Sequence, residues 1–228
     1  MAHYVLLHGA LGAAADLSAL ANALMNKGHT AEALQLDPNG LEAVPAMAEK
    51  LAHHLESQPS PAHVFGYSMG GYVALYLAAY RPELFVHLTT LAVKLNWQQE
   101  SANVAAYRET LAWMSPSVLS EKFPNLQQEL ERTHGEEWAN VSEQTAAMLV
   151  EIATHNYLSK ELAVKITTPV TLLIGQNDKM VTLTETQHVA AWLPYARCEV
   201  LPGVKHPLPS CSVETLLAHL LPSISSPF

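Results

Sequence analysis

The pentapeptide Gly66-Tyr67-Ser68-Met69-Gly70 contains the side chain best suited to chemistry in this chain. It fits the pattern G-x-S-x-G, a strained turn between a strand and a helix that holds a serine hydroxyl exposed at the edge of a sheet. A short apolar run at 62–65 precedes the turn, and apolar residues at helical spacing follow it over 71–80. A serine hydroxyl is a weak nucleophile at neutral pH, so this interpretation requires a base, an acid that orients the base, and donors for an oxyanion.

Asp178 and His206 are the expected acid and base, because in this architecture the acid follows the serine and the histidine comes last. Residues 169–174 are typical of a buried strand, and Asp178 lies in the loop that follows it. Residues 197–201 predict a further short strand, and His206 lies in the loop after that one. The carboxyl ends of parallel strands meet at one edge of a sheet, so we expect both side chains beside Ser68.

A competing acid would have to follow the strand expected at 86–93. The loop after that strand offers Lys94 and Asn96 and no carboxylate before Glu100, so Asp178 is preferred. Taken singly, each residue of the set has an ordinary structural alternative as a turn, cap or solvated residue. Their order, and their positions after expected strands, favour the catalytic interpretation.

Oxyanion donors are expected from two backbone amides. One is the N–H of Met69, the residue after the nucleophile, and the other comes from the glycine-punctuated turn 8–12 that follows the apolar strand at 4–7. Ala10 is the predicted donor in that turn. His8 could serve as a second base, but a histidine that opens such a turn more often holds the loop by hydrogen bonds.

Four motifs in this order, HGALG, GYSMGG, IGQNDKMV and GVKHP, resemble the α/β-hydrolase superfamily over roughly residues 3–93 and 166–221. The resemblance implies a mostly parallel sheet flanked by helices, a triad of Ser68, Asp178 and His206, and hydrolysis of an ester or related acyl substrate. Epoxide hydrolases and haloalkane dehalogenases of this superfamily carry an aspartate at the elbow, and Ser68 argues against both. The chain enters at HYVLLHG, so we expect the two leading strands of larger members to be missing.

The pattern along the chain predicts an α/β fold with a sheet of about six strands, because strand-like and helix-like segments alternate. Strands are expected at 4–7, 30–36, 62–65, 86–93, 169–174 and 197–201, and helices at about 15–27, 41–57, 71–80, 184–193 and 211–221. Residues 94–165 show no strand pattern but amphipathic helical stretches broken near Pro116 and Pro124. We therefore expect an α/β-hydrolase core at 1–93 and 166–228, with 94–165 as a helical cap over the nucleophile.

Lys94 and Trp97 are candidate substrate-binding residues, because they leave the strand that ends nearest the cap. A lysine at this position could meet a substrate carboxylate or polarise a carbonyl. Pairing of Lys94 with Glu100 is the alternative that we favour. The aromatic residues of the cap are expected to form its own core rather than a substrate cage.

Composition agrees with one globular domain: 49% of the 228 residues are hydrophobic and 14% are charged. A net charge of −9 argues against nucleic-acid and anionic-membrane partners, which need a basic surface. Cys198 and Cys211 form no disulfide framework, and no run approaches the roughly 18 apolar residues that span a bilayer. The apolar amino terminus lacks a leading Lys or Arg, which favours a cytoplasmic protein over a secreted one.

These observations predict a carboxylesterase that uses an acyl-enzyme intermediate and acts on a small acyl substrate, as a monomer or homodimer. No metal or cofactor is expected, because no HExxH or clustered Cys/His spacing occurs. Two alternatives stay open. A carbon–carbon bond hydrolase, thioesterase, acyltransferase or lyase could use the same residues, and a non-catalytic receptor could retain them without turnover.

Overall fold

A six-stranded, all-parallel sheet forms the centre of the molecule, with strand order β2-β1-β3-β4-β5-β6. This computed structural model describes residues 1–40, 42–58 and 61–221. The predicted sheet is confirmed. Strand ends differ by a few residues from the expected ones, and the bounds are β1 (His3–Leu7), β2 (Thr30–Leu34), β3 (Ala62–Tyr67), β4 (Phe85–Leu91), β5 (Val170–Gly175) and β6 (Ala196–Leu201).

Helices connect the strands as expected for parallel neighbours, which require crossover connections. The helix predicted at 15–27 begins as a 3-10 turn, and position 41 of the helix predicted at 41–57 lies outside the described residues. The connecting elements are η1 (Ala14–Leu17), α1 (Ser18–Asn26), α2 (Ala43–Glu56), α3 (Met69–Ala78), η2 (Pro82–Leu84), α10 (Leu183–Ala190), η5 (Leu208–Ser210) and α11 (Val213–Leu220).

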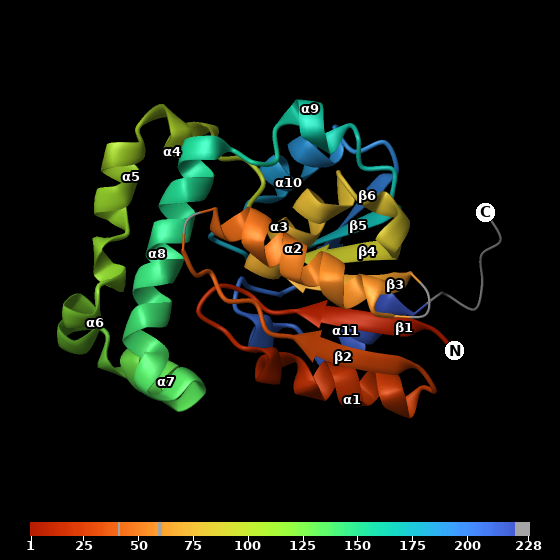
Figure 1. Ribbon diagram of the computed structural model, residues 1–228, viewed down its shortest axis with the longest axis horizontal. Helices are drawn as coiled ribbons and strands as arrows, with labels where there is room; N and C mark the ends of the chain where they lie inside the picture. Colours follow the sequence, from red (N-terminus) through yellow and green to blue (C-terminus); the bar gives the residue numbers. More distant parts are fainter. Residues whose placement is uncertain (41, 59–60, 222–228) are drawn as a thin grey trace.

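The inner strands β1, β3, β4 and β5 are mostly buried, because helices cover each face of the sheet (Figure 1). In β1, Val5 and Leu7 belong to the cluster that contains α2, α3 and α10. Tyr4 and Leu6, which point to the opposite face, pack with α1 and α11. Helix α3 is buried along nearly its whole length, so the elbow at its amino end is anchored by the core.

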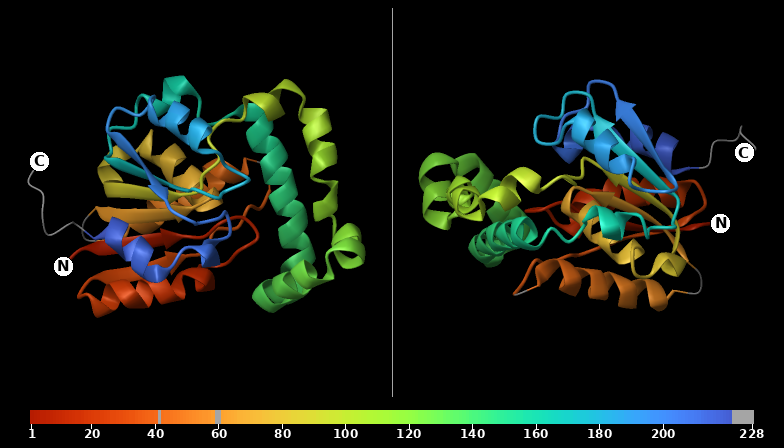
Figure 2. Two further views of the ribbon diagram at one scale, coloured as in Figure 1. Left: turned by 180° about the vertical axis from the view of Figure 1, so that it is seen from behind. Right: turned by 90° about the horizontal axis from the view of Figure 1, so that it is seen from above.

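Residues 94–165, all of which are described, contain helices and no strand. Figures 1 and 2 show α4 to α8 as a group beside the sheet and α9 near α10, and the arrowheads of β1 and β2 point toward α8. Pro116 and Pro124 occupy first helical positions, where a missing N–H costs nothing. The elements are α4 (Gln98–Ala102), α5 (Val104–Thr110), η3 (Ala112–Met114), α6 (Pro116–Lys122), α7 (Pro124–His134), η4 (Gly135–Glu137), α8 (Trp138–His155) and α9 (Lys160–Ala163).

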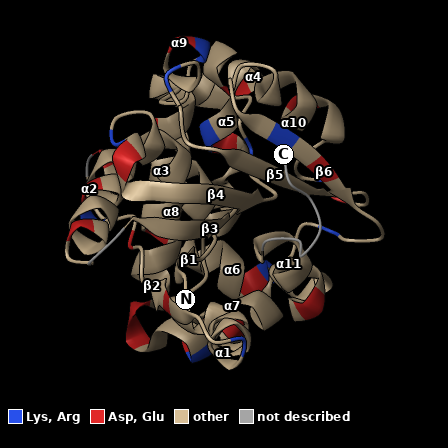
Figure 3. Ribbon diagram, turned by 90° about the vertical axis from the view of Figure 1, so that its right-hand side faces the viewer, with Lys and Arg blue, Asp and Glu red and all other residues tan. Residues whose placement is uncertain are grey.

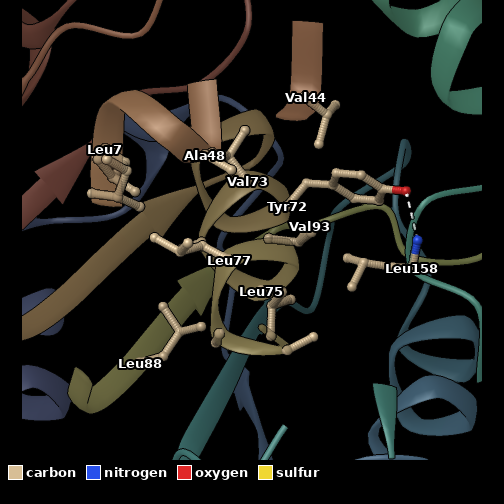
Figure 4. Close-up of a cluster of buried hydrophobic side chains, with 14 of the residues drawn as sticks. Leu7, Val44, Ala48, Tyr72, Val73, Leu75, Leu77, Leu88, Val93 and Leu158 are labelled. Atoms are coloured by element: carbon tan, nitrogen blue, oxygen red, sulfur yellow. Dashed lines mark hydrogen bonds between the residues drawn. The ribbon is translucent and has the colours of Figure 1, made fainter. Parts of the chain in front are cut away.

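The carboxyl end of α8 packs into the same apolar cluster as the core helices, through Met148 and Ile152. The Leu158 N–H donates a 3.3 Å hydrogen bond to the Tyr72 hydroxyl of α3, beside Val44 of α2 (Figure 4). Burial raises the pKa of Tyr72, so its hydroxyl stays protonated. One hydrophobic cluster contains residues from both sides of the predicted boundary at residue 94, such as Val93 and Leu95. The division into a core and a separate cap stays a prediction.

Charged residues are sparse, with 12 Lys and Arg against 21 Asp and Glu. Both kinds lie scattered over the helices and loops in the view of Figure 3. Within the described ranges, none of the helices combines the length and the apolar character needed to cross a bilayer. Cys198 and Cys211 are both free thiols.

Candidate active site

Ser68 occupies a backbone conformation that L-amino acids rarely adopt, with φ 48° and ψ −113°. It lies between the end of β3 and the first residue of α3, and its N–H donates a 2.8 Å hydrogen bond to the carbonyl of Leu91 at the end of β4. The side chain is partly exposed. Such strain persists only where the surrounding structure enforces it, and it concentrates at functional sites.

The glycines around Ser68 are required by close backbone approach. A Cβ at Gly66 would lie 2.4 Å from Gly71 Cα, and a Cβ at Gly70 would lie 2.7 Å from the carbonyl oxygens of Leu7 and His8. No side chain fits at either position without moving backbone. The tight turn and the dense packing of α3 on β1 therefore explain both glycines of the motif.

Asp178 and His206 are joined by a hydrogen bond of 2.9 Å between Asp178 Oδ2 and His206 Nδ1. The other carboxylate oxygen, Oδ1, accepts hydrogen bonds from the N–H groups of Met180 and Val181, at 2.8 and 2.9 Å. The Asp178 side chain is fully buried and that of His206 is 13% exposed. An ionised carboxylate only accepts, so Nδ1 carries the hydrogen and Nε2 is left to accept a proton.

The loops that carry these two residues are packed together after β5 and β6. A Cβ at Gly175 would lie 2.5 Å from the Val204 carbonyl oxygen, and the Asn177 N–H donates to that same oxygen at 2.9 Å. These contacts fix the separation of the two loops. They place Asp178 and His206 at the same sheet edge as Ser68.

Tyr67 supports His206, a role that the sequence interpretation missed. Its hydroxyl donates a 3.0 Å hydrogen bond to the His206 carbonyl, and the two rings lie 5.8 Å apart. Burial raises the pKa of Tyr67 to about 12, which keeps the hydroxyl a donor. The only sequence signal for Tyr67 was its position beside the serine, which does not show where its hydroxyl points.

Ser68 Oγ makes no hydrogen bond to any residue in the described part of the chain, including His206. In structures without substrate, catalytic hydrogen bonds are often long and shorten only in the complex. The pairing of Ser68 with His206 stays a prediction. What the structure shows is an oriented Asp178–His206 pair at the edge where the strained serine emerges.

His8 holds the turn at residues 8–12, hereafter the 8–12 loop. Its Nδ1–H donates to the Gly9 carbonyl at 2.8 Å, and its Nε2 accepts from the Leu36 N–H at 2.9 Å. Burial lowers the pKa of His8, which is 2% exposed, so the ring stays neutral. Both ring nitrogens are occupied, which fits the structural role expected for His8 and leaves neither nitrogen available as a second base.

The two predicted oxyanion donors lie on adjoining segments. The Gly70 N–H donates to the His8 carbonyl at 3.1 Å, which joins the 8–12 loop to the start of α3. Met69 is the first residue of α3, where an amide has no acceptor within the helix. Neither the Met69 nor the Ala10 N–H has a hydrogen-bond partner in the described ranges. Their use by an oxyanion stays a prediction.

A residue of the helical segment also contacts the 8–12 loop. His134, at the end of α7, donates from Nε2–H to the Leu11 carbonyl at 3.0 Å. Leu11 has a positive φ of 62°, so its carbonyl is held in an unusual direction. The sequence interpretation missed His134, because this contact joins residues far apart in the chain and no motif marks it.

Lys94 and Trp97 have structural partners. Lys94 Nζ lies 3.3 Å from Glu100 and 3.9 Å from Glu185, and 5.4 Å from the centre of the Trp97 ring. Trp97 is 4% exposed and packs in the core cluster. The geometry favours the pairing of Lys94 with Glu100, and substrate contact by Lys94 or Trp97 stays an untested prediction.

A cavity of about 130 Å³ opens between the 8–12 loop, the segment after β2 and the first turns of α8. Met69, Leu11 and Gly12 line it, so it adjoins both predicted oxyanion donors. Its remaining lining residues come from residues 35–39 and from the helical segment, together with His8. Across the described ranges, no cluster of His, Cys, Asp and Glu has the geometry of a metal site.

The arrangement of strands, elbow and loops is that of known α/β hydrolases. A "putative lipase" from Acinetobacter baumannii AYE is 19% identical and has a TM-score of 0.73, with 96% of this chain and 81% of that chain covered. An esterase from Thermogutta terrifontis is 20% identical, with a TM-score of 0.68 and coverage of 92% and 84%. NosK from Streptomyces actuosus is 22% identical, with a TM-score of 0.70 and coverage of 90% and 89%. The chain therefore has the α/β-hydrolase fold.

The chain belongs to the family described as "Putative esterase", whose model matches residues 45–209. The matched range contains Ser68, Asp178 and His206, but it begins after the 8–12 loop. A search of curated proteins gave no match. Family and fold together make this protein a hydrolase of the esterase and lipase type.

Proposed function

We propose that the protein is a serine hydrolase that cleaves a small carboxylic ester through an acyl-enzyme intermediate. One observation carries this proposal: a buried Asp178–His206 hydrogen bond of 2.9 Å lies at the sheet edge where Ser68 is held in a strained turn. Membership of an esterase family favours an oxygen ester over a thioester or a carbon–carbon bond. The last two remain substrates that the same groups could act on.

In the proposed reaction, His206 Nε2 takes the proton of Ser68 Oγ as that oxygen attacks the substrate carbonyl. Asp178 keeps the ring oriented and stabilises its cation. The N–H groups of Met69 and Ala10 receive the oxyanion, which collapses when His206 returns the proton to the departing alcohol. Water then attacks the acyl-enzyme, gives its proton to His206 and releases the acid, and the proton returns to Ser68.

The helices of residues 94–165 stand over the carboxyl ends of the strands in this proposal (Figure 2). They would shield the reacting groups from bulk water, which strengthens the electrostatic interactions around the oxyanion. Substrate reaches the serine between these helices and the sheet edge. The small volume of the adjoining cavity fits a small acyl or alcohol group better than a polymer.

The proposal is tested by Ser68→Ala with p-nitrophenyl butyrate as substrate. We expect kcat/KM to fall by about 10⁴-fold or more, because the groups of a triad act as a unit. Circular dichroism should show an intact fold. Ser18→Ala, an exposed serine on α1, is the matched control and should retain full activity. Retained turnover in Ser68→Ala would overturn the proposal, and labelling of Ser68 by a fluorophosphonate without turnover of any ester would favour a receptor.

A further inference from the structure

The cavity beside the 8–12 loop has a polar lining that the hydrolytic reaction itself does not use. Asp37 and Asn39 follow β2, whereas Glu137, Asn140 and Thr145 come from η4 and α8 on the facing side. Leu11, Gly12 and Met69 connect this lining to the two predicted oxyanion donors. Met69 follows Ser68 directly, so the cavity begins one residue from the proposed nucleophile.

The charge around the cavity is negative. Asp37 and Glu137 line it, and no Lys or Arg does. Burial raises the pKa of Asp37, but hydrogen bonds from Gln35 and Lys50 outweigh burial and hold that pKa below its usual value, so the carboxylate is ionised. Lys50 offsets one charge, at 3.1 Å from Asp37.

Asp16 adds a third carboxylate near the 8–12 loop, where it accepts from the Ala13 N–H at 2.9 Å. His8 is neutral and so contributes no positive charge. His134, the other histidine of the lining, donates to the Leu11 carbonyl. Carboxylates therefore outnumber cations around the cavity.

Thr145 is an independent sign of a missing ligand. Thr145 is one of the residues that line the cavity, and it is fully buried. Within the described part of the chain its hydroxyl has no hydrogen-bond partner. Buried hydroxyls are normally paired, because an unpaired one loses its hydrogen bonds to water without replacement. An N–H donor in the cavity would supply the missing partner.

We infer that this cavity is a substrate subsite for a primary ammonium group carried by the ester. An ammonium has three N–H donors and a positive charge, which match the Thr145 hydroxyl, the amide oxygens of the lining and the carboxylates of Asp37 and Glu137. A carboxylate in the same place would face like charges and find no cation. This inference rests on the proposed function, and it defines the substrate class within it.

The test compares three p-nitrophenyl esters of similar length, 6-aminohexanoate, heptanoate and hydrogen adipate, which end in an ammonium, a methyl and a carboxylate. Wild-type kcat/KM should be about tenfold higher for the ammonium ester than for the adipate. In Glu137→Gln, the ratio of kcat/KM for the ammonium ester to kcat/KM for heptanoate should fall by about threefold. The effect is modest because Glu137 is exposed, so solvent partly screens its attraction to the substrate ammonium. Glu136→Gln, an exposed neighbour outside the lining, is the matched control.

Thr145→Val separates ligand binding from structure. Valine has nearly the same shape as threonine but no hydroxyl, so the Tm of the Thr145→Val variant should be equal to or above that of wild type. The KM of this variant for the ammonium ester should rise. Its KM for heptanoate should not. A second substrate pair, 6-aminohexyl acetate and heptyl acetate, places the ammonium on the alcohol. The pair whose ratio responds to Glu137→Gln identifies which half of the ester enters the cavity.

Equal turnover of the ammonium ester and the adipate by wild type, or equal effects of Glu136→Gln and Glu137→Gln on every pair, would overturn the subsite. In that case Ser68-dependent hydrolysis of heptanoate would leave the proposed function standing. Hydrolysis of heptanoate that survives Ser68→Ala would instead remove the function on which the subsite rests. The two failures are therefore distinguishable.

Discussion

Ser68, the proposed nucleophile, has an energetically unfavourable backbone conformation. Its φ of 48° and ψ of −113° are accessible to glycine but are strained for residues with a Cβ. The Leu91 carbonyl, the α3 amino end and the neighbouring glycines hold it there. The fold therefore gives up stability at the residue on which the proposed chemistry depends.

Replacing Ser68 by glycine should release this strain. We expect Ser68→Gly to be more stable than Ser68→Ala by about 1–2 kcal/mol, which is a few degrees in Tm for a domain of this size. Both variants lack the hydroxyl, so the comparison isolates the backbone. Thermal unfolding followed by circular dichroism measures the difference. An alanine variant as stable as the glycine variant would show that the turn is not strained.

The sequence indicated the sheet edge at which Ser68, Asp178 and His206 lie, because each residue follows an expected strand, at 62–65, 169–174 and 197–201. It could not find Tyr67 or His134 as supporting residues. Their contacts, with the His206 and Leu11 carbonyls, depend on how distant loops meet in space. Lys94 drew attention for its position after β4, but its pairing with Glu100 depends on the turn between them.

At the scale of elements, a side-chain hydrogen bond connects α7 to the 8–12 loop. His134 Nε2–H donates to the Leu11 carbonyl, and Leu11 follows the predicted oxyanion donor Ala10. A loop that carries a backbone donor must be held within a fraction of an ångström. We therefore expect the helical segment to help position the 8–12 loop through this hydrogen bond.

His134→Ala should reduce kcat for p-nitrophenyl butyrate by about tenfold, a smaller effect than the loss of a whole oxyanion donor. KM should change little, because the variant loosens a transition-state contact rather than a ground-state one. Arg132→Ala, an exposed residue on the same helix, is the control. Equal kcat values for the two variants would show that the His134 contact does not position the loop.

Two neighbouring strands carry partly buried histidines that make the free energy of unfolding depend on pH. His63 of β3 and His87 of β4 are register partners, and His87 lies 2.9 Å from the Thr171 hydroxyl. Burial lowers the pKa of His87 to about 4, with further contributions from Arg197 and His63. An unfolded histidine titrates near 6.5, so between these values the unfolded chain binds more protons than the folded one.

The free energy of unfolding should therefore be highest above about pH 6.5 and should fall as pH drops toward about 4. His87→Gln keeps a hydrogen-bonding group for Thr171 but does not titrate. We expect its Tm to decline less steeply than that of wild type over this range, with the remaining decline owed in part to His8 and His63, whose pKa values burial also lowers. Parallel declines in the two proteins would contradict the assignment to His87.

Most strands of the α/β core were predictable as short apolar runs, and its helices by apolar residues at a spacing of nearly four. Residues 94–165 were predictable only as helical. Their packing follows from contacts that no local pattern encodes, such as Met148 and Ile152 of α8 inserted among core residues. The break points at Pro116 and Pro124 were correct because proline favours the first turn of a helix.

At the scale of the whole molecule, one parallel sheet collects residues that are far apart in the sequence at its carboxyl edge. Ser68 follows β3, Asp178 follows β5 and His206 follows β6. These three strands belong to the same sheet (Figure 1). The helical segment lies over the same edge and brings His134 to the 8–12 loop. With the sheet and the helices α5–α8 side by side (Figure 1), a chain of 228 residues holds both a strained serine and a cavity of about 130 Å³.

The most direct test of the central claim is the mass of the protein after reaction with diethyl p-nitrophenyl phosphate. The account predicts one diethylphosphoryl group per chain, located on Ser68 by peptide mapping, with release of one equivalent of p-nitrophenol. Labelling should be absent in Ser68→Ala and should slow by about 10³-fold or more in His206→Ala, because the base is lost. A label on another residue, or equal labelling rates in wild type and His206→Ala, would contradict it.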